Sequence, residues 1–466
     1  MHLTRPKPLI LSPLEEVVSG LCNEAARAEL WEQLAETRHL KEPQINAFEQ
    51  IASDLPKGVS GPFNGLLITV KDQIAVAGWP RWFGLEKTTK TKDRKSAPFV
   101  KTLQNMGCVV QGKTALPPHA LDLQTFNARR GPTENPHRMG FTVGGSSGGG
   151  AAAVASGMSL LDIGADLAGS LRLPASWCGV SSLVPTEGRF DSKGMLPEDH
   201  LLDHFGRMGP IARSCNDLAF FWKTLTGETH SPTPNQNARL LIWSPIDHTP
   251  MERHVSDLWS RLGNTLIENG ISVERDSMSA LFHADIRKLF GEIMGYETGA
   301  MLPFFIRWLL RRDTDAIARS PQFLKHVYQG YRREHRQYAK NLKRLEELRQ
   351  NMLRQLETCD ALILPVSGVA AFPHTPPIKE RGGVRTYDKE FQTLAGPLPY
   401  LDALTYFTVP TGVLGWPIVT VPFAVDHNGV PMGFQLVGKP NEETKLLSIA
   451  CALEQAMPFT STDDEQ

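Results

Sequence analysis

Residues 144–174 read GGSSGGGAAAVASGMSLLDIGADLAGSLRLP, a dense run of glycine, alanine and serine. The run holds a glycine-flanked serine pair, Ser146 and Ser147, and a third serine, Ser170, in its own glycine-containing turn. Because glycine and alanine side chains are small, we expect residues 147–156 to form a helix that packs close to neighbouring backbone. Upstream, the strand-like apolar run at 66–70 delivers one lysine, Lys71. Two serines and a lysine in such settings predict a nucleophile, a proton relay and a base.

The chemistry of these residue types explains why all three are needed. A serine hydroxyl is a poor nucleophile until a base removes its proton, and the glycine-rich segment contains no histidine to do so. Burial disfavours the ammonium form of lysine, so a buried lysine can serve as the base. A second serine can pass the proton along a hydrogen-bond chain. Backbone N–H groups of the turn at 167–170 can form an oxyanion hole.

Structural explanations compete with this interpretation. Glycine- and serine-rich runs are common in flexible linkers, but apolar and alanine-rich sequence surrounds this one. A phosphate-binding P-loop is disfavoured because no lysine follows the glycines at GxxxxGK[ST] spacing. A single lysine after a strand is usually a surface residue. The residues alone therefore leave the catalytic and structural interpretations both open.

Composition limits the class of protein. The 466 residues are 41% hydrophobic and 21% charged, with a formal net charge of -1. The overall charge therefore produces no electrostatic attraction to nucleic acid or to an anionic membrane. Six cysteines lack CxxC spacing, which argues against a disulfide scaffold or a zinc site and favours a reducing compartment, the cytoplasm. The N-terminus lacks the apolar region of a signal peptide. No apolar run of about 18 residues predicts a transmembrane helix.

Hydrophobic patterning predicts one large α/β domain. Residues 12–53 have helical spacing, with Ser12 as the expected N-cap. From residue 64 short apolar runs alternate with amphipathic segments, which is typical of a layered fold with a buried sheet. We expect an N-terminal helical region at 1–63 and a main domain at 64–460, with a mainly helical insertion at about 230–360. The amphipathic helix expected at 331–357 has a basic face, but interleaved glutamates favour a solvated surface over nucleic-acid binding.

Eight ordered segments carry a resemblance to a known family: VKDQIAVAG (70–78), GPTENP (131–136), GGSSGGGAAAVASG (144–157), GADLAGSLRLPASWCGV (164–180), PTEGRF (185–190), DHFGRMGPIARSCNDLA (203–219), GWPIVTVPF (415–423) and GVPMGFQLVG (429–438). With these segments the chain resembles the amidase signature family. The resemblance implies a mixed central sheet surrounded by helices and a Ser–cis-Ser–Lys triad. It makes Lys71 the general base, Ser146 the relay serine after a cis peptide bond, and Ser170 the nucleophile.

The same resemblance implies the surroundings of the triad. The backbone N–H groups of Leu167, Ala168, Gly169 and Ser170 are expected to form the oxyanion hole. Ser147, Asp166 and Arg172 match polar positions that hold the turn. Neither a metal nor an organic cofactor is expected for the reaction.

Several positions depart from the family pattern. Ala168 stands where the family has glycine, and Ala115, Ala165 and Val184 replace its usual asparagine, threonine and lysine. If position 168 requires a positive φ, alanine must strain or reshape the oxyanion hole.

The predicted function is a serine amidase that hydrolyses a small-molecule carboxamide through an acyl-enzyme on Ser170. The same acyl-enzyme with an amine acceptor would make an amide-forming acyltransferase, as in natural-product biosynthesis. A third possibility is the amidase subunit of an amidotransferase, which would need a partner protein. A fourth is a scaffold protein that has lost catalysis.

Residues 301–312, MLPFFIRWLLRR, are strongly apolar with a basic end. Three interpretations are open, in order of preference. The first is an insertion helix packed on the core, and the second is a wall or lid of an acyl-binding pocket. The third is a peripheral membrane contact, since Trp, Phe and Arg suit a headgroup boundary. A homodimer is an open alternative to a monomer.

Overall fold

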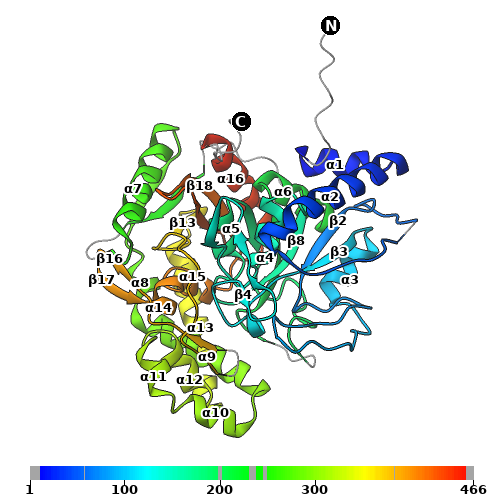
Figure 1. Ribbon diagram of the computed structural model, residues 1–466. Helices are drawn as coiled ribbons and strands as arrows, with labels where there is room; N and C mark the ends of the chain where they lie inside the picture. The colour runs from blue at the N-terminus through cyan, green and yellow to red at the C-terminus, as the bar shows by residue number, and fades with distance from the viewer. Residues whose placement is uncertain are drawn as a thin grey trace.

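An eleven-stranded mixed sheet forms the centre of the molecule (Figure 1). The computed structural model describes residues 11–56, 58–197, 202–229, 238–244, 249–381 and 384–457. The strands follow the order β1 (Phe48–Ile51), β3 (Val109–Thr114), β2 (Leu67–Lys71), β8 (Leu161–Asp166), β10 (Arg207–Ala212), β9 (Ser181–Val184), β18 (Ile418–Val425), β19 (Pro431–Val437), β13 (Ala361–Pro365), β11 (Leu240–Trp243) and β12 (Val273–Asp276).

Strand direction changes across this sheet. β2 runs parallel to β3 and β8, and β11 runs parallel to β12 and β13, whereas the pairs between β8 and β13 are antiparallel. The strands β2, β3 and β8 are buried along their whole length, as expected for sheet strands covered on both faces. The predicted α/β fold with a mixed central sheet is confirmed.

Helices surround the sheet. Outside the predicted insertion, the helices up to residue 226 and the last two of the chain are α1 (Leu14–Gly20), α2 (Glu24–Ile45), α3 (Pro98–Asn105), α4 (Gly148–Ala155), α5 (Arg172–Cys178), α6 (Cys215–Thr226), α15 (Thr408–Val413) and α16 (Glu443–Ala456). Four two-stranded sheets lie outside it: β4 (Phe126–Asn127) with β5 (Gly131–Pro132), β6 (Glu134–Asn135) with β7 (Arg138–Thr142), β14 (Lys379–Arg381) with β15 (Val384–Thr386), and β16 (Glu390–Thr393) with β17 (Gly396–Pro399). Within the described ranges, no helix is both long and apolar enough to cross a membrane.

The segment predicted as a helical insertion contributes to the sheet and to a second core. Its strands β11 and β12 extend the central sheet. Its helices from α9 onward gather at one end of the molecule, away from α1 and α2 (Figure 1). They build a separate apolar cluster around Phe290 and Tyr328. The insertion helices are α7 (Arg253–Glu268), α8 (Ser279–Phe282), α9 (Ala284–Thr298), α10 (Phe304–Leu310), α11 (Thr314–Ala318), α12 (Leu324–Gly330) and α13 (His335–Gln355), and α14 (Tyr400–Leu404) follows later in the chain.

Helix α4 shows why the glycine-rich stretch folds as it does. A Cβ on Gly149 would lie 2.3 Å from the backbone nitrogen of Ala115, and one on Gly150 would lie 2.0 Å from Oδ2 of Asp162. Only glycine therefore fits where α4 crosses β3 and β8. The expected close packing of this small-residue helix is confirmed, and it places Ser146 and Ser147 beside the C-terminal ends of β2 and β8.

Three local predictions are wrong. Ser12 does not cap a helix; α1 begins at Leu14, whose N–H donates to Oδ1 of the buried Asp217 instead. The predicted helical region at 12–53 ends in strand β1, which pairs with β3. The predicted single helix at 331–357 begins later, at His335, because Arg333 takes a left-handed conformation (φ 55°) that separates α12 from α13.

Candidate active site

Lys71 lies at the end of β2, fully inside the molecule. Its Nζ donates a hydrogen bond of 2.7 Å to Oγ of Ser146. Burial lowers the pKa of Lys71 to about 7, against the opposing effect of the carboxylates of Asp162 and Asp166. A substantial fraction of this lysine is therefore neutral near pH 7 and able to accept a proton.

The two serines continue this hydrogen-bond chain. Oγ of Ser146 donates to Oγ of Ser170 over 3.0 Å, and the Gly145–Ser146 peptide bond is cis. Ser170 lies in the turn between β8 and α5, and its carbonyl accepts the N–H of Ser147 at 3.0 Å. The structure thus joins Lys71, Ser146 and Ser170 in one hydrogen-bonded chain, and all three line the same cavity.

An ion pair holds the turn that carries Ser170. Arg172 donates from Nε and Nη2 to the two oxygens of Asp166, at 3.1 and 2.8 Å. Burial by itself raises the pKa of Asp166, but the guanidinium and the N–H donors hold that pKa well below its usual value. Arg172 also reaches the α15 and β19 segments through Thr408, Thr411 and Gln435.

Ser147 takes a different position from its neighbour. Its Oγ donates to the carbonyl oxygen of Ala165 over 3.2 Å, on the strand that leads into the turn. Ser147, Asp166 and Arg172 therefore all contact the turn or its neighbouring backbone. Their role in holding the turn stays a prediction.

The N–H groups of the turn divide into two sets. Gly169 N–H donates to Oδ1 of Asp166 at 3.0 Å, so the expectation that it forms part of the oxyanion hole is not met in this conformation. Asp166 accepts that bond because its carboxylate caps the turn. Among the described hydrogen bonds, none engages the N–H groups of Leu167, Ala168 or Ser170. These three remain as oxyanion-hole candidates.

The condition under which Ala168 would be strained, a positive φ at position 168, is not met. The positive φ of the turn falls on Gly169 (118°), and Ala168 is not among the residues with positive φ. A Cβ on Gly169 would also lie 2.8 Å from the side chain of Thr408, whose hydroxyl donates to the Ala168 carbonyl at 2.6 Å. Glycine is required at 169, and alanine is accommodated at 168.

Sequence reasoning missed a buried carboxylate beneath the lysine. Oδ1 of Asp162 accepts from the hydroxyls of Thr69 (2.8 Å) and Thr114 (3.0 Å), while Oδ2 is buried without a hydrogen-bond partner. Burial raises the pKa of Asp162 to about 6. A charged residue inside the apolar run LLDIGAD was the signal that this position is unusual.

A cavity of about 410 Å³ opens beside Ser170. Among its described lining residues the charged side chains are Lys71 and Asp166, both engaged in the contacts above. Burial lowers the pKa of His119, which also lines it, so this imidazole is neutral at pH 7. The remaining wall is mainly apolar and includes Leu121, Met195, Leu196, Leu202, Met294, Met301, Leu302, Ile306, Leu310 and Tyr331. A smaller cavity of about 70 Å³ also reaches Ser170.

The 301–312 segment forms one wall of the larger cavity. Leu302, Ile306 and Leu310 point their side chains into it. Phe304 and Phe305 on the same short helix are exposed, at 74% and 60% of their surface. The segment thus has an inner apolar face toward the cavity and an outer apolar face toward solvent.

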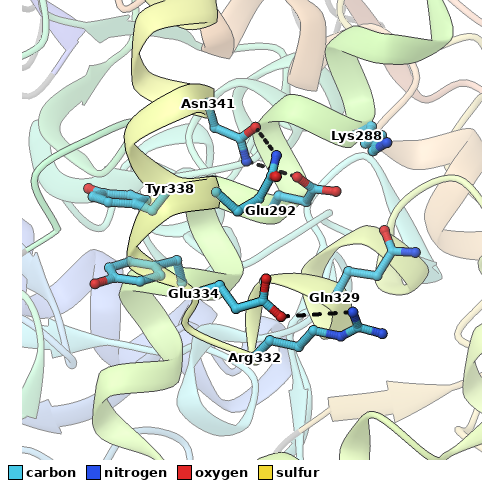
Figure 2. Close-up of a pocket in the computed structure, with 10 residues that line it drawn as sticks. Lys288, Glu292, Gln329, Arg332, Glu334, Tyr338 and Asn341 are labelled. Atoms are coloured by element: carbon cyan, nitrogen blue, oxygen red, sulfur yellow. Dashed lines mark hydrogen bonds and ion pairs between the residues drawn. The ribbon is translucent and has the colours of Figure 1, made fainter.

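A second hollow, of about 260 Å³, lies among α9, α12 and α13 (Figure 2). Two pairs of its polar side chains interact: Asn341 donates to Glu292 at 2.8 Å, and Arg332 lies 3.9 Å from Glu334. Its lining includes no serine, threonine or cysteine to serve as a nucleophile. The hydrogen-bonded lysine and serines lie instead at the cavity beside Ser170.

Comparisons with known proteins agree with this geometry. The family model described as Amidase matches residues 26–447. One of the subunits of the glutamyl-tRNA(Gln) amidotransferase from Pseudothermotoga lettingae is 26% identical over 87% of this chain and 89% of its own length. A solved amidase crystal structure superposes with a TM-score of 0.78 at 25% identity, covering 96% of this chain and all of its own. A bacterial aryl acylamidase of the amidase signature family shares the fold at 19% identity and a TM-score of 0.73, over 97% and 98% of the two chains.

Proposed function

Because the chain belongs to the Amidase family, we propose that it hydrolyses carboxamides with Ser170 as nucleophile, Ser146 as proton relay and Lys71 as base. The observation that carries this proposal is the continuous hydrogen-bond chain from a buried lysine through one serine to another, at 2.7 and 3.0 Å. Each of these distances is short enough for direct proton transfer.

In the acylation step the two hydroxyl groups rotate, so that Ser170 donates to Ser146 and Ser146 donates to neutral Lys71. Lys71 then takes the proton of Ser146 as Ser146 takes the proton of Ser170. The Ser170 oxygen forms a bond to the amide carbon, and the carbonyl oxygen becomes an oxyanion facing the N–H groups of Leu167, Ala168 or Ser170. The C–N bond then breaks, and the relayed proton leaves with the amine. Water repeats the sequence and releases the acid, which restores the enzyme.

The cavity supports a neutral substrate with an apolar body. An amino-acid amide would bring charged groups into the cavity, where each needs a counter-charge. Lys71 and Asp166 are already engaged by Ser146 and Arg172, and His119 is neutral. The wall contributed by Leu302, Ile306 and Leu310 suits an aryl or alkyl group.

Hydrolysis of an amide series tests the proposal. Wild-type protein is expected to release ammonia from aryl- and alkyl-carboxamides, with kcat/KM rising with apolar chain length, and Ser170→Ala is expected to be inactive. Addition of hydroxylamine or a primary amine distinguishes the acyltransferase alternative by the amount of new amide formed. Activity only in the presence of a copurified stoichiometric partner protein would instead support the amidotransferase alternative. No release of ammonia from any amide would contradict the proposal.

We also propose that the outer face of α10 contacts a lipid surface. Phe304, Phe305, Trp308 and Leu309 are exposed on this helix, and Arg307, Arg311 and Arg312 carry charges suited to anionic headgroups. Because the inner face of the helix lines the cavity, an apolar amide dissolved in a bilayer would enter beside it.

Flotation with vesicles of phosphatidylcholine and phosphatidylserine tests this contact. Wild-type protein is expected to float, Phe304→Ser/Trp308→Ser to stay at the bottom, and Leu394→Ser, a change at an exposed leucine of β17's hairpin, to float like wild type. Wild-type protein that remains at the bottom would exclude the contact.

The homodimer stays a prediction. Light scattering, which measures the mass of the protein in solution, decides between a monomer and a dimer.

A further inference from the structure

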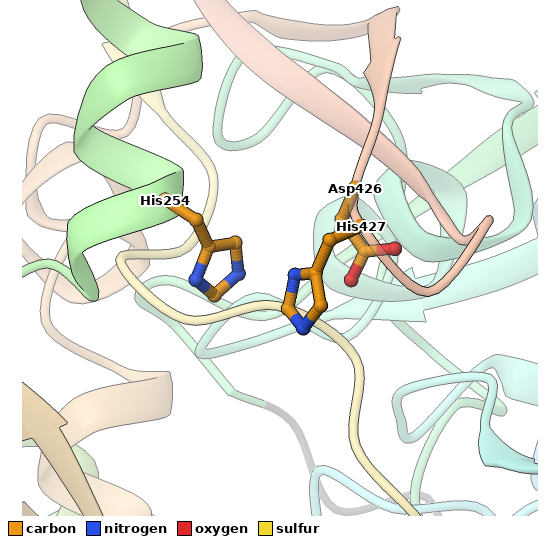
Figure 3. A group of neighbouring side chains, drawn as sticks. All are labelled: His254, Asp426 and His427. Carbon is orange, nitrogen blue, oxygen red and sulfur yellow. The ribbon is translucent and has the colours of Figure 1, made fainter.

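Two histidines and an aspartate meet at the junction of α7 with the β18–β19 hairpin (Figure 3). His254 lies in the first turn of α7, and Asp426 and His427 open the hairpin turn. One ligand atom from each side chain lies within 4.8 Å of the others. We propose that these three side chains bind a divalent transition-metal ion of the zinc class.

His254 supplies the first argument. Its Nε2 is buried and has no hydrogen-bond partner among the described residues. The nearest carboxylate oxygen, Oε2 of Glu252, is 3.8 Å away, too far for a hydrogen bond, and it accepts the N–H of Ala370. A buried polar nitrogen without a partner is costly, and a bound ion removes that cost.

His427 lies against His254. Their ring centroids are 4.4 Å apart with an interplanar angle of 81°. Two imidazoles this close can share one metal ion through their ring nitrogens. His427 is exposed, so the site is open to metal from solution. Its Nε2 lies 3.1 Å from Nδ2 of Asn428, a contact that either leaves Nδ1 for the ion or is replaced by it.

Asp426 is held in a fixed orientation. Oδ1 accepts the N–H groups of Asn428 and Val430, both at 2.8 Å. Oδ2 has only a contact of 3.3 Å with Nδ2 of Asn428, so it keeps a lone pair for an ion. Such contacts orient a ligating carboxylate.

The donor set selects the kind of metal. Two imidazoles and one carboxylate suit Zn²⁺ and its neighbours better than Mg²⁺ or Ca²⁺, which prefer all-oxygen sites. Three protein ligands leave a tetrahedral position for water. None of the three side chains lines the serine cavity, so the ion would tie α7 to the hairpin and take no part in amide cleavage.

Metal titration of the untagged, chelator-treated protein tests the site. We expect one Zn²⁺ per chain in a competition assay with a chromophoric chelator, and a Co²⁺ visible spectrum of tetrahedral intensity. His254→Ala and His427→Ala are each expected to weaken Zn²⁺ binding at least tenfold and to abolish the Co²⁺ bands, whereas His39→Ala, at an exposed position on α2, binds like wild type.

Stability gives an independent readout. Saturating Zn²⁺ is expected to raise the Tm of wild type by a few degrees and to leave the Tm of the double variant His254→Ala/His427→Ala unchanged. Absence of stoichiometric binding to folded wild type, or equal binding by the double variant, would overturn the proposal. Because amidase activity is expected to be the same with and without chelator, failure here leaves the serine site untouched.

Discussion

Lys71 determines the pH dependence of the proposed reaction. Burial lowers its pKa to about 7, so the lysine is mostly protonated below pH 7 and mostly neutral above it. Since only the neutral form accepts a proton, kcat/KM is expected to rise with pH to a plateau, with its midpoint near pH 7. A pH–rate profile from pH 5.5 to 9 on a neutral amide measures this. A rate that is flat or falls over that range would contradict the role of Lys71.

The buried Lys71 is also expected to lower the free energy of unfolding at pH 7. Its pKa is about 10.5 in the unfolded chain and about 7 in the folded one, so the unfolded state binds more protons between these pH values. The free energy of unfolding of wild type should therefore rise between pH 7 and 10 relative to Lys71→Met. At pH 7 this variant is expected to be inactive yet more stable by about 1–3 kcal/mol. Urea denaturation at both pH values measures the difference; a less stable Lys71→Met at pH 7 would contradict it.

At this scale the sequence predicted which residues meet, but not how the turn is used. The motif positions of Lys71, Ser146 and Ser170 were enough to expect their proximity. The bond from Gly169 N–H to Asp166 depends on a side-chain rotamer in a turn, which spacing does not determine. Asp162 was missed because its partners Thr69 and Thr114 come from strands whose register is a tertiary property.

Helix α4 is the element that depends most on side-chain size. A methyl group at position 150 would meet the carboxylate of Asp162 at 2.0 Å, with Thr69 and Thr114 holding that carboxylate in place. Gly150→Ala is expected to lower the free energy of unfolding by about 3 kcal/mol, measured by chemical denaturation. Ala155→Gly, a one-methyl change at the half-buried end of the same helix, should cost only about 1 kcal/mol. Equal effects of the two changes would show that α4 is not tightly packed.

Element prediction worked where periodicity was unambiguous. The strand-like apolar run at 66–70 became β2, shifted by one residue. The N-cap at Ser12 failed because a distant carboxylate, Asp217, satisfies the helix terminus instead. The break before α13 depends on the left-handed conformation of Arg333, for which no glycine or proline gives a local sign.

Contacts of the insertion helices with the rest of the domain join the two parts of the molecule. Arg349 on α13 donates to both oxygens of Glu187, at 2.9 and 3.1 Å, and to the carbonyl of Val413 at 3.0 Å. This pair is mostly buried, so Arg349→Ala leaves Glu187 without its main partner and is expected to cost about 3 kcal/mol in thermal or chemical unfolding. Arg344→Ala on the same helix removes an exposed pair with Asp285 and should cost less than about 1 kcal/mol. A loss at Arg349 no larger than at Arg344 would mean that this bridge does not join the two parts.

The central claim is that Ser170 is the activated nucleophile of the site. Intact-mass and peptide mass spectrometry after exposure to a fluorophosphonate probe tests it most directly. We expect one adduct on wild type, located on Ser170, no adduct on Ser170→Ala, and labelling slowed at least a hundredfold in Lys71→Ala. An adduct on Ser146 or Ser147, or unchanged labelling of Ser170→Ala, would contradict the account.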